Sequence, residues 1–295
     1  MKCLTNGFKV TDNQMSPNIA ILQQSGNSMI MKTSLVNTVW FSEKRKNLLL
    51  LLNEGERDIE QIKKSLNVTT RSIMPQIKTL KNENLIKQEE EDFSLTVIGK
   101  IIVKNMLPFI ETSRIVEENK DFWTSRNFDA IPAHLFSRIR YIGHYFLIEP
   151  DINHMFELPR EFVDNIPKSK TITTFVSYLH PEFISLYLKA AESGTDISLF
   201  LSEPALEKIR KEYLEQFTEL IEMENTTIFL CKENPKIPMI TVTDWFCYIC
   251  LFNGEERYDH RDIISFDDSS LKWCHDLFDY YRNNSKKLYQ IKELE

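Results

Sequence analysis

The stretch Asp58–Asn82, DIEQIKKSLNVTTRSIMPQIKTLKN, constrains the fold more than any other part of the 295-residue chain. Its apolar residues recur at three- and four-residue intervals, which predicts two amphipathic helices. These residues are Ile59, Ile62 and Leu66 in the first helix and Ile73, Ile77 and Leu80 in the second. Asn67-Val68 predicts a tight turn between them, and Thr69 is a favourable N-cap for the second helix. Together these features predict a helix-turn-helix.

The second helix has an apolar seam on one side and a polar face on the other. At 100° per residue, Arg71, Pro75, Lys78 and Asn82 lie opposite the seam. A helix that enters the major groove of DNA needs this division. We therefore predict DNA contacts by Thr69, Thr70, Arg71, Ser72, Pro75, Lys78, Thr79 and Asn82. Candidate phosphate contacts are Lys63 and Lys64 on the preceding helix, and Lys44-Arg45-Lys46 before it.

The flanking segments predict a winged helix-turn-helix. The leucine-rich segment Thr33–Asn53 predicts one or two supporting helices, and Leu85–Gln88 with Phe93–Val97 predicts a hairpin. The turn Glu89–Asp92 is wholly acidic, so we do not expect the tip of this wing to enter a groove. An amphipathic helix from Ile98 to about Glu118 would link two domains or pair with its twin in a dimer.

Charge is distributed unevenly along the chain. The net charge is −7, yet residues 31–110 hold 13 Lys/Arg against 10 Asp/Glu, whereas residues 111–295 hold 21 against 32. The positive surplus therefore coincides with the predicted helix-turn-helix, where phosphates would be bound.

The length favours two domains. Residues 1–30 predict a flexible tail, with Met31 a reasonable alternative start. We predict a winged helix-turn-helix over 31–110, a helical linker region over 111–150 and an α/β regulatory domain over 151–295. The longest apolar runs, such as Leu48–Leu52, are far too short to span a bilayer, and the N-terminus lacks a signal peptide. We therefore expect a cytoplasmic protein that does not enter a membrane.

Strand and helix patterns alternate after Ile152, which predicts an α/β layered domain with a mixed sheet and an α+β class for the whole chain. Predicted strands are Ile172–Leu179, Asp196–Leu201, Thr227–Cys231, Met239–Thr243, Phe246–Phe252 and Ile263–Phe266. Predicted helices are Pro181–Glu192, Pro204–Glu224 and Ser269–Lys287. Asn253-Gly254 is a hairpin signal that leads into a further strand, Glu256–His260.

Cys247 and Cys250 form a C-x-x-C, which is either a redox pair or two buried structural thiols. Positions three apart in a strand point to opposite faces, so a disulfide would need the strand to be broken. Buried thiols are the favoured interpretation. The other cysteines lack the spacing of a metal site.

No motif of catalysis or cofactor binding is present. A phospholipase-D-type site needs His-x-Lys, and none of the six histidines is followed by lysine two residues later. P-loop, GxGxxG, GxSxG and HExxH patterns are also missing. We therefore predict no catalytic residue, metal or cofactor. The aromatics around Tyr141–Phe146 and Trp245–Phe252 predict ordinary core, with an effector pocket as the alternative.

The order of these features resembles a family of archaeal regulators, the methanogenesis and filamentation regulators. The resemblance rests on four segments between about Val36 and Lys287, namely SLNVTTRSIMPQIKTLKNENLI, LTVIGK, DFWTSRNFDAIPAHLFSRI and IISFDDSSLKWCHDLFDYYRNNSK. It implies sequence-specific binding of double-stranded DNA, as a dimer, with a regulatory domain similar to a phospholipase-D-type fold that has lost its catalytic motif.

The leading hypothesis is therefore a homodimeric DNA-binding transcriptional regulator whose C-terminal domain dimerises and takes a small-molecule effector. One alternative is a thiol-based redox or metabolite sensor with indirect DNA contact. Another is an enzyme on the α/β domain, for which only the fold class argues.

Overall fold

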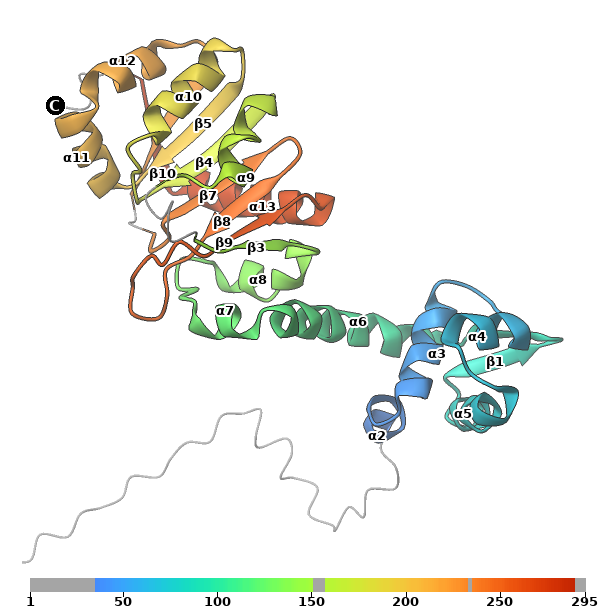
Figure 1. The fold of residues 1–295 in the computed structure, drawn as a ribbon. Coiled ribbons are helices and arrows are strands. Elements are labelled where there is room, and N and C mark those ends of the chain that lie inside the picture. The colour runs from blue at the N-terminus through green and yellow to red at the C-terminus, as the bar shows by residue number, and fades with distance from the viewer. Residues whose placement is uncertain (1–34, 151–156, 233–234, 290–295) are drawn as a thin grey trace, which may run out of the picture. The chain divides into compact units, whose positions relative to one another are not determined.

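The computed structural model describes residues 35–150, 157–232 and 235–289. By its internal contacts the chain divides into an N-terminal unit that ends at Lys104 and a C-terminal unit that begins at Asn105. Figure 1 shows the helices and strands of each unit. The predicted tail, residues 1–30, lies outside the described residues.

The N-terminal unit is a set of short helices followed by a hairpin. Its elements are α2 (Leu35–Trp40), α3 (Glu43–Asn53), α4 (Ile59–Leu66), α5 (Thr70–Asn82), β1 (Ile86–Glu89), β2 (Asp92–Leu95) and α6 (Val97–Glu118), which continues beyond Lys104. The strands β1 and β2 are antiparallel, and Arg57 adds a bridge to Phe93 of β2. This arrangement confirms the predicted winged helix-turn-helix, and the leucine-rich support consists of two helices.

The turn between α4 and α5 is fixed by local chemistry at its ends. The Asp58 carboxylate accepts a hydrogen bond from the Gln61 N–H at 2.8 Å, and the Gln61 side chain accepts one from the Asp58 N–H at 3.2 Å. This capping box starts α4. Asn67 ends the helix in the left-handed conformation, with φ of 49°. Thr69 occupies the N-cap of α5 as predicted, but its side chain makes no capping hydrogen bond.

The apolar seam of α5 joins the core of the N-terminal unit. Ile73, Ile77 and Leu80 are at most 1% exposed. The core also includes Leu48, Leu49, Leu52, Ile62, Leu85 and Phe93, all of which are buried. Each such side chain contributes about 1.5–3 kcal/mol on burial, so three seam residues fix which face of α5 turns outward.

The C-terminal unit contains an eight-stranded sheet in the order β10-β6-β5-β4-β7-β8-β9-β3. The strands are β3 (Phe146–Ile148), β4 (Thr171–Val176), β5 (Asp196–Leu201), β6 (Thr226–Cys231), β7 (Met239–Thr243), β8 (Cys247–Cys250), β9 (Asp262–Ser265) and β10 (Ser285–Leu288). Strands β4, β5 and β6 run parallel, and the other pairings are antiparallel. The predicted mixed sheet and α/β layering are confirmed.

Helices cover both faces of this sheet (Figure 1). Side chains of α9 (Arg160–Val163), α10 (Phe183–Glu192), α11 (Glu203–Glu212) and α12 (Leu214–Glu222) pack into one core layer. Side chains of α7 (Lys120–Ser125), α8 (Ala133–Phe136) and α13 (Asp268–Asn283) pack into the other. The short 3₁₀ helices are η1 (Ile139–Ile142) and η2 (Ile166–Lys168).

Residues 111–150 differ from the predicted helical linker. Phe122 and Trp123 of α7 are buried in the core layer beside α13, and β3 pairs with β9 at the sheet edge. This segment therefore belongs to the C-terminal unit. Its aromatic side chains give it too much apolar surface to remain a linker exposed to water.

Three predicted boundaries in the C-terminal unit were wrong. The helix predicted over Pro204–Glu224 breaks at Tyr213 into α11 and α12. The last predicted helix ends at Asn283, because the following residues pair with the edge of β6 as β10. Residues Glu256–His260 form no strand but belong to a loop in which Glu256 and His260 have positive φ.

Gly99 offers a test of the N-terminal packing. A Cβ at this position would lie 2.0 Å from the Leu85 carbonyl oxygen, so backbone would have to move. We expect Gly99→Ala to lower the free energy of unfolding by at least about 2 kcal/mol. Urea denaturation of the full chain measures this. The matched control is Gly254→Ala, whose Cβ would come no closer than 3.9 Å to Ser125. Equal stability of the two variants would contradict the packing described here.

Candidate nucleic-acid interface

Helix α5 turns its polar face to solvent. Of the eight predicted contact residues, Thr69, Thr70, Arg71, Pro75, Lys78 and Asn82 are exposed, while Ser72 and Thr79 are half-buried. They form one surface that extends from the N-cap to the last residue of the helix. Thirteen residues at 1.5 Å each make the helix about 20 Å long.

Some side chains on this surface already form hydrogen bonds within the helix, and others do not. Among the described residues, Arg71 and Lys78 make no ion pair. The Ser72 hydroxyl donates to the Thr69 carbonyl at 3.0 Å, and the Thr79 hydroxyl donates to the Pro75 carbonyl at 3.0 Å. The two cationic groups are therefore available to a partner, and the two hydroxyls are occupied within the helix.

Met74, which helical spacing places beside the polar face, has 42% of its area exposed. One further residue of this surface was missed in the sequence. Lys81 donates to the Gln88 side chain at 3.0 Å and so links α5 to the wing strand β1. Its position one turn after Lys78 was the available signal.

The basic residues that precede α5 have separate roles. Arg45 of α3 donates to the Thr38 carbonyl and, at 2.8 Å, to the Gln76 side chain of α5. Lys46 is paired with Glu43 at 2.6 Å and Lys63 with Glu60 at 2.8 Å. Lys64 is exposed and has no ion pair among the described residues. Arg45 therefore holds two helices together, and Lys64 is the freer of the two cations predicted on α4.

The wing tip is acidic and exposed, as its sequence predicts. Glu90 has φ of 55° at the turn, and Glu89 forms an ion pair with Lys87 at 2.5 Å. The Glu89 carboxylate raises the pKa of Lys87. One of the few cations of the wing is thus neutralised within the hairpin.

The two cysteines of the C-x-x-C lie on opposite faces of the sheet. Cys247 belongs to the core layer beside α13 and Cys250 to the layer beside α10. Both lie within β8 and are at most 1% exposed. A disulfide between them would need the strand to be broken, and their burial fits the favoured interpretation of two structural thiols. No group of three metal-ligating side chains occurs within residues 35–150, 157–232 and 235–289.

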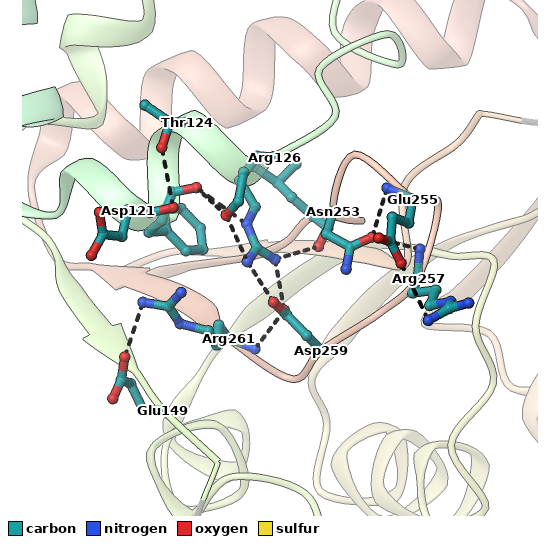
Figure 2. Close-up of polar contacts among 12 residues, drawn as sticks. Asp121, Thr124, Arg126, Glu149, Asn253, Glu255, Arg257, Asp259 and Arg261 are labelled. Carbon is teal, nitrogen blue, oxygen red and sulfur yellow. Dashed lines mark hydrogen bonds and ion pairs between the residues drawn. The ribbon is translucent and has the colours of Figure 1, made fainter.

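Arg126, from the motif FWTSR, holds the segment after α7 to the loop between β8 and β9. Its side chain is 1% exposed and forms a bidentate pair with Asp259 at 2.6 and 2.5 Å. Figure 2 shows this pair, with Asn253 of the same loop beside Arg126. Burial favours a higher pKa for Asp259, but hydrogen bonds from Arg126 outweigh it and lower the pKa. From the sequence, Arg126 was noted only as part of the segment that carries the family resemblance, without a role of its own.

Two family models match the chain. The model described as methanogenesis regulatory protein FilR1, N-terminal domain, matches residues 34–113, and the model of the middle domain of the same protein matches residues 155–284. Together they account for more than half of the sequence. The chain belongs to the methanogenesis regulatory protein FilR1 family. The resemblance predicted from the sequence is confirmed.

A relative in this family is methanogenesis regulatory protein FilR1 of Methanothrix harundinacea (strain 6Ac), which is 23% identical over 259 residues. The alignment covers 84% of this chain and 56% of the relative, so the chain spans little more than half of the relative's length. Helices α4 and α5 fall within the N-terminal domain of the family, and β4 to β9 within its middle domain.

Solved structures show more distant likenesses. TrmBL2, described as an archaeal chromatin protein with a novel mode of DNA binding, is 10% identical with a TM-score of 0.38, over 83% of this chain and 94% of that chain. Nuc of Salmonella typhimurium, a phospholipase D family member, is 10% identical with a TM-score of 0.37, over 50% and 100%. Both TM-scores are below 0.5, which is too low to indicate a shared function. Within the described part of the chain, none of the helices has the length and apolar character needed to cross a bilayer.

The thiols provide a test of the buried interpretation. Burial raises the pKa of Cys250 and leaves little thiolate to react, whereas a hydrogen bond with Cys274 lowers the pKa of Cys247. Both side chains are at most 1% exposed, so a reagent in solution does not reach them. In the native full-length protein we expect Cys247 and Cys250 to be labelled by Ellman's reagent far more slowly than in guanidinium, with labelled sites identified by mass spectrometry. Rapid native labelling of either thiol, or a disulfide between them after mild oxidation, would contradict this assignment.

Proposed function

We propose that this chain is a sequence-specific DNA-binding transcriptional regulator that acts in the cytoplasm as a homodimer, and that its C-terminal unit receives a small-molecule effector. The observation that carries the proposal is the outer face of α5, where Arg71 and Lys78 are exposed and make no ion pair with any described residue, while the opposite seam is buried. A helix of this kind enters the major groove with its N-terminal residues against base edges.

Each residue of the face suits a different part of the groove. Arg71 lies in the first turn, where a guanidinium can bond to guanine in a bidentate manner. Lys78 lies two turns later and suits a guanine or a phosphate. Pro75 presents an apolar ring of the kind that contacts a thymine methyl group. Thr69, Thr70 and Asn82 add polar groups at the two ends of the helix, and Ser72 and Thr79 contribute shape more than hydrogen bonds.

The supporting helices position this face and add electrostatic attraction. Arg45 fixes α3 to α5 through Gln76, so it orients the proposed recognition helix without touching DNA. Lys64, exposed near the end of α4, is the preferred phosphate contact. Lys63 is already neutralised by Glu60 and contributes less. The acidic wing tip stays away from the phosphates.

The homodimer rests on the charge of the N-terminal unit and on its surface. A net charge of +3 over residues 31–110 is modest for one copy, and two copies would double it at the DNA. Large apolar side chains are exposed at Val36, Phe41, Val97 and Ile98. Exposed apolar surface of this kind suits a protein partner, and a second copy is the proposed one.

We expect Arg71→Ala with Lys78→Ala to weaken binding to the preferred sequence by at least about 30-fold, because each base contact contributes about 1–3 kcal/mol. Selection from a randomised duplex library with the full-length protein first supplies that sequence. Titrations at fixed salt then compare it with a scrambled duplex. A homodimer predicts an enriched site with two half-sites about one helical turn apart.

The matched control is Lys170→Ala with Lys211→Ala, which removes the same charge from exposed positions of the C-terminal unit. Circular dichroism checks that each variant folds. Wild-type affinity in the Arg71 and Lys78 variant, or a library without any enriched sequence, would overturn the proposal.

Lys64 and Lys63 make a second test by salt dependence. Removing a phosphate contact reduces the slope of log K against log salt by about 0.9. We expect Lys64→Ala to produce this reduction on specific and scrambled DNA alike, and Lys63→Ala to produce a smaller one. Equal slopes for the wild type and the Lys64 variant would remove Lys64 from the interface.

A further inference from the structure

A cavity lies at one end of the central sheet in the C-terminal unit. Val176, the last residue of β4, pairs with Met239 of β7; Met239 pairs with Cys250 of β8, and Cys250 with Asp262 of β9. The cavity opens to solvent at its mouth, and its empty volume of ≈ 380 Å³ includes that open space. It is lined by Met239 and Cys250 of this row and by loop residues that follow β4 and β8. The end of the sheet at which parallel strands terminate is a common place for small ligands.

Aromatic rings form most of the cavity wall. Tyr178, Tyr258 and His260 cluster together, with ring centroids 5.4 Å apart for the two tyrosines and 4.3 Å apart for Tyr258 and His260. Phe162 and Tyr248, 4.9 Å apart, form a buried part of the wall. Such a wall presents several electron-rich ring faces, which attract cations.

A buried carboxyl group stands directly behind this wall. The Asp262 side chain accepts hydrogen bonds from the Tyr248 hydroxyl at 2.7 Å and the Tyr258 hydroxyl at 2.8 Å, both to the same oxygen. Its other oxygen is buried and has no hydrogen-bond partner within the described residues. The neighbouring Arg261 pairs with Glu149 at 3.0 Å. Arg261 is thus engaged elsewhere, and Asp262 forms no ion pair with any described residue. A buried carboxylate without a nearby cation is unfavourable.

The wall also lacks the groups that would hold an anion. Neither lysine nor arginine lines the cavity within the described part of the chain. Burial lowers the pKa of His260 and outweighs the Asp259 carboxylate, which raises it, so the ring is neutral at pH 7. Phosphates and carboxylates would therefore meet π faces and a carboxyl group, which repel them.

The ring pair at the mouth is held in place from outside the cavity. Tyr258 and His260 flank Asp259, whose carboxylate is bound by Arg126 (Figure 2). The backbone of the same loop is fixed at its start, where the Asn127 N–H donates to the Phe252 carbonyl at 2.9 Å. The loop is thus anchored by contacts outside the cavity, and a ligand need not order its backbone.

We propose that this cavity binds a small organic cation of the quaternary ammonium type, with the tyrosine and histidine rings enclosing the alkylated nitrogen and Asp262 supplying the counter-charge through the hydroxyls of Tyr248 and Tyr258. The role of the cation as an effector of DNA binding rests on the proposed function. The binding itself is independent of it.

The test is isothermal titration calorimetry of the full-length protein at constant ionic strength, with choline and with its neutral isostere 3,3-dimethyl-1-butanol. We expect saturable binding of choline at one site per chain and at least about 10-fold weaker binding of the alcohol, which lacks the charge. Equal binding of the two, no binding of choline, or binding of inorganic phosphate at this site would overturn the proposal.

Variants at Tyr178 separate ring chemistry from folding, because this side chain is 43% exposed at the mouth. Tyr178→Phe keeps the π face and should keep the affinity for choline, whereas Tyr178→Leu should weaken it by roughly 2-fold to 30-fold. Asp262→Asn should reduce the preference for choline over the alcohol, because the ring faces remain but the counter-charge is removed. Unchanged affinity in Tyr178→Leu, or an unchanged preference in Asp262→Asn, would contradict the assignment.

DNA titrations with and without choline complete the design. A change in affinity for the selected sequence supports the effector role. Choline binding without selectable DNA would refute the proposed function and leave the cavity assignment standing. Sequence-specific DNA binding without choline binding would refute the cavity assignment and leave the proposed function standing.

Discussion

The burial of the α5 seam is the constraint on which the proposed DNA surface depends. Ile73, Ile77 and Leu80 can be buried together only if the helix has one particular rotation about its axis. That rotation exposes Arg71 and Lys78 on the opposite side. Arg45 adds a hydrogen bond to Gln76, which lies between the two faces. Apolar packing thus decides which polar groups meet a partner, and the polar groups themselves contribute little to folding.

In the C-terminal unit, the ion pair between buried Arg126 and half-buried Asp259 has a comparable role. Arg126 bonds to both oxygens of Asp259 and to the Leu251 carbonyl, and stacks on Phe122 at 4.6 Å. Removing Asp259 would leave the charge of Arg126, whose side chain is 1% exposed, without its partner, which is destabilising. The pair joins segments that are 133 residues apart in sequence. It therefore fixes a long loop that has no regular secondary structure to hold it.

The sequence was sufficient where structure is set by local periodicity. The helices α4 and α5, the wing and strand β5 lie close to their predicted bounds, since side-chain spacing and capping residues determine them. The sequence was insufficient where a segment takes its structure from contacts with residues far away in the chain. Strands β3 and β10 form because β9 and β6 present open edges. Residues 256–260 leave the expected strand because Arg126 binds Asp259. Of the candidate site, the α5 face was predictable from spacing, whereas the cavity joins residues from several loops.

The two proposed sites divide the charge of the chain between them. The outer face of α5 carries cations, while the cavity of the C-terminal unit is lined by rings, without lysine or arginine among the described residues. The net charge of −11 over residues 111–295 repels nucleic acid from that unit and attracts a cation to it. A polyanion and a small cation are therefore directed to different units of one chain. This separation lets a regulator bind both without competition, provided that the α5 face stays positively charged and the cavity stays free of cationic side chains.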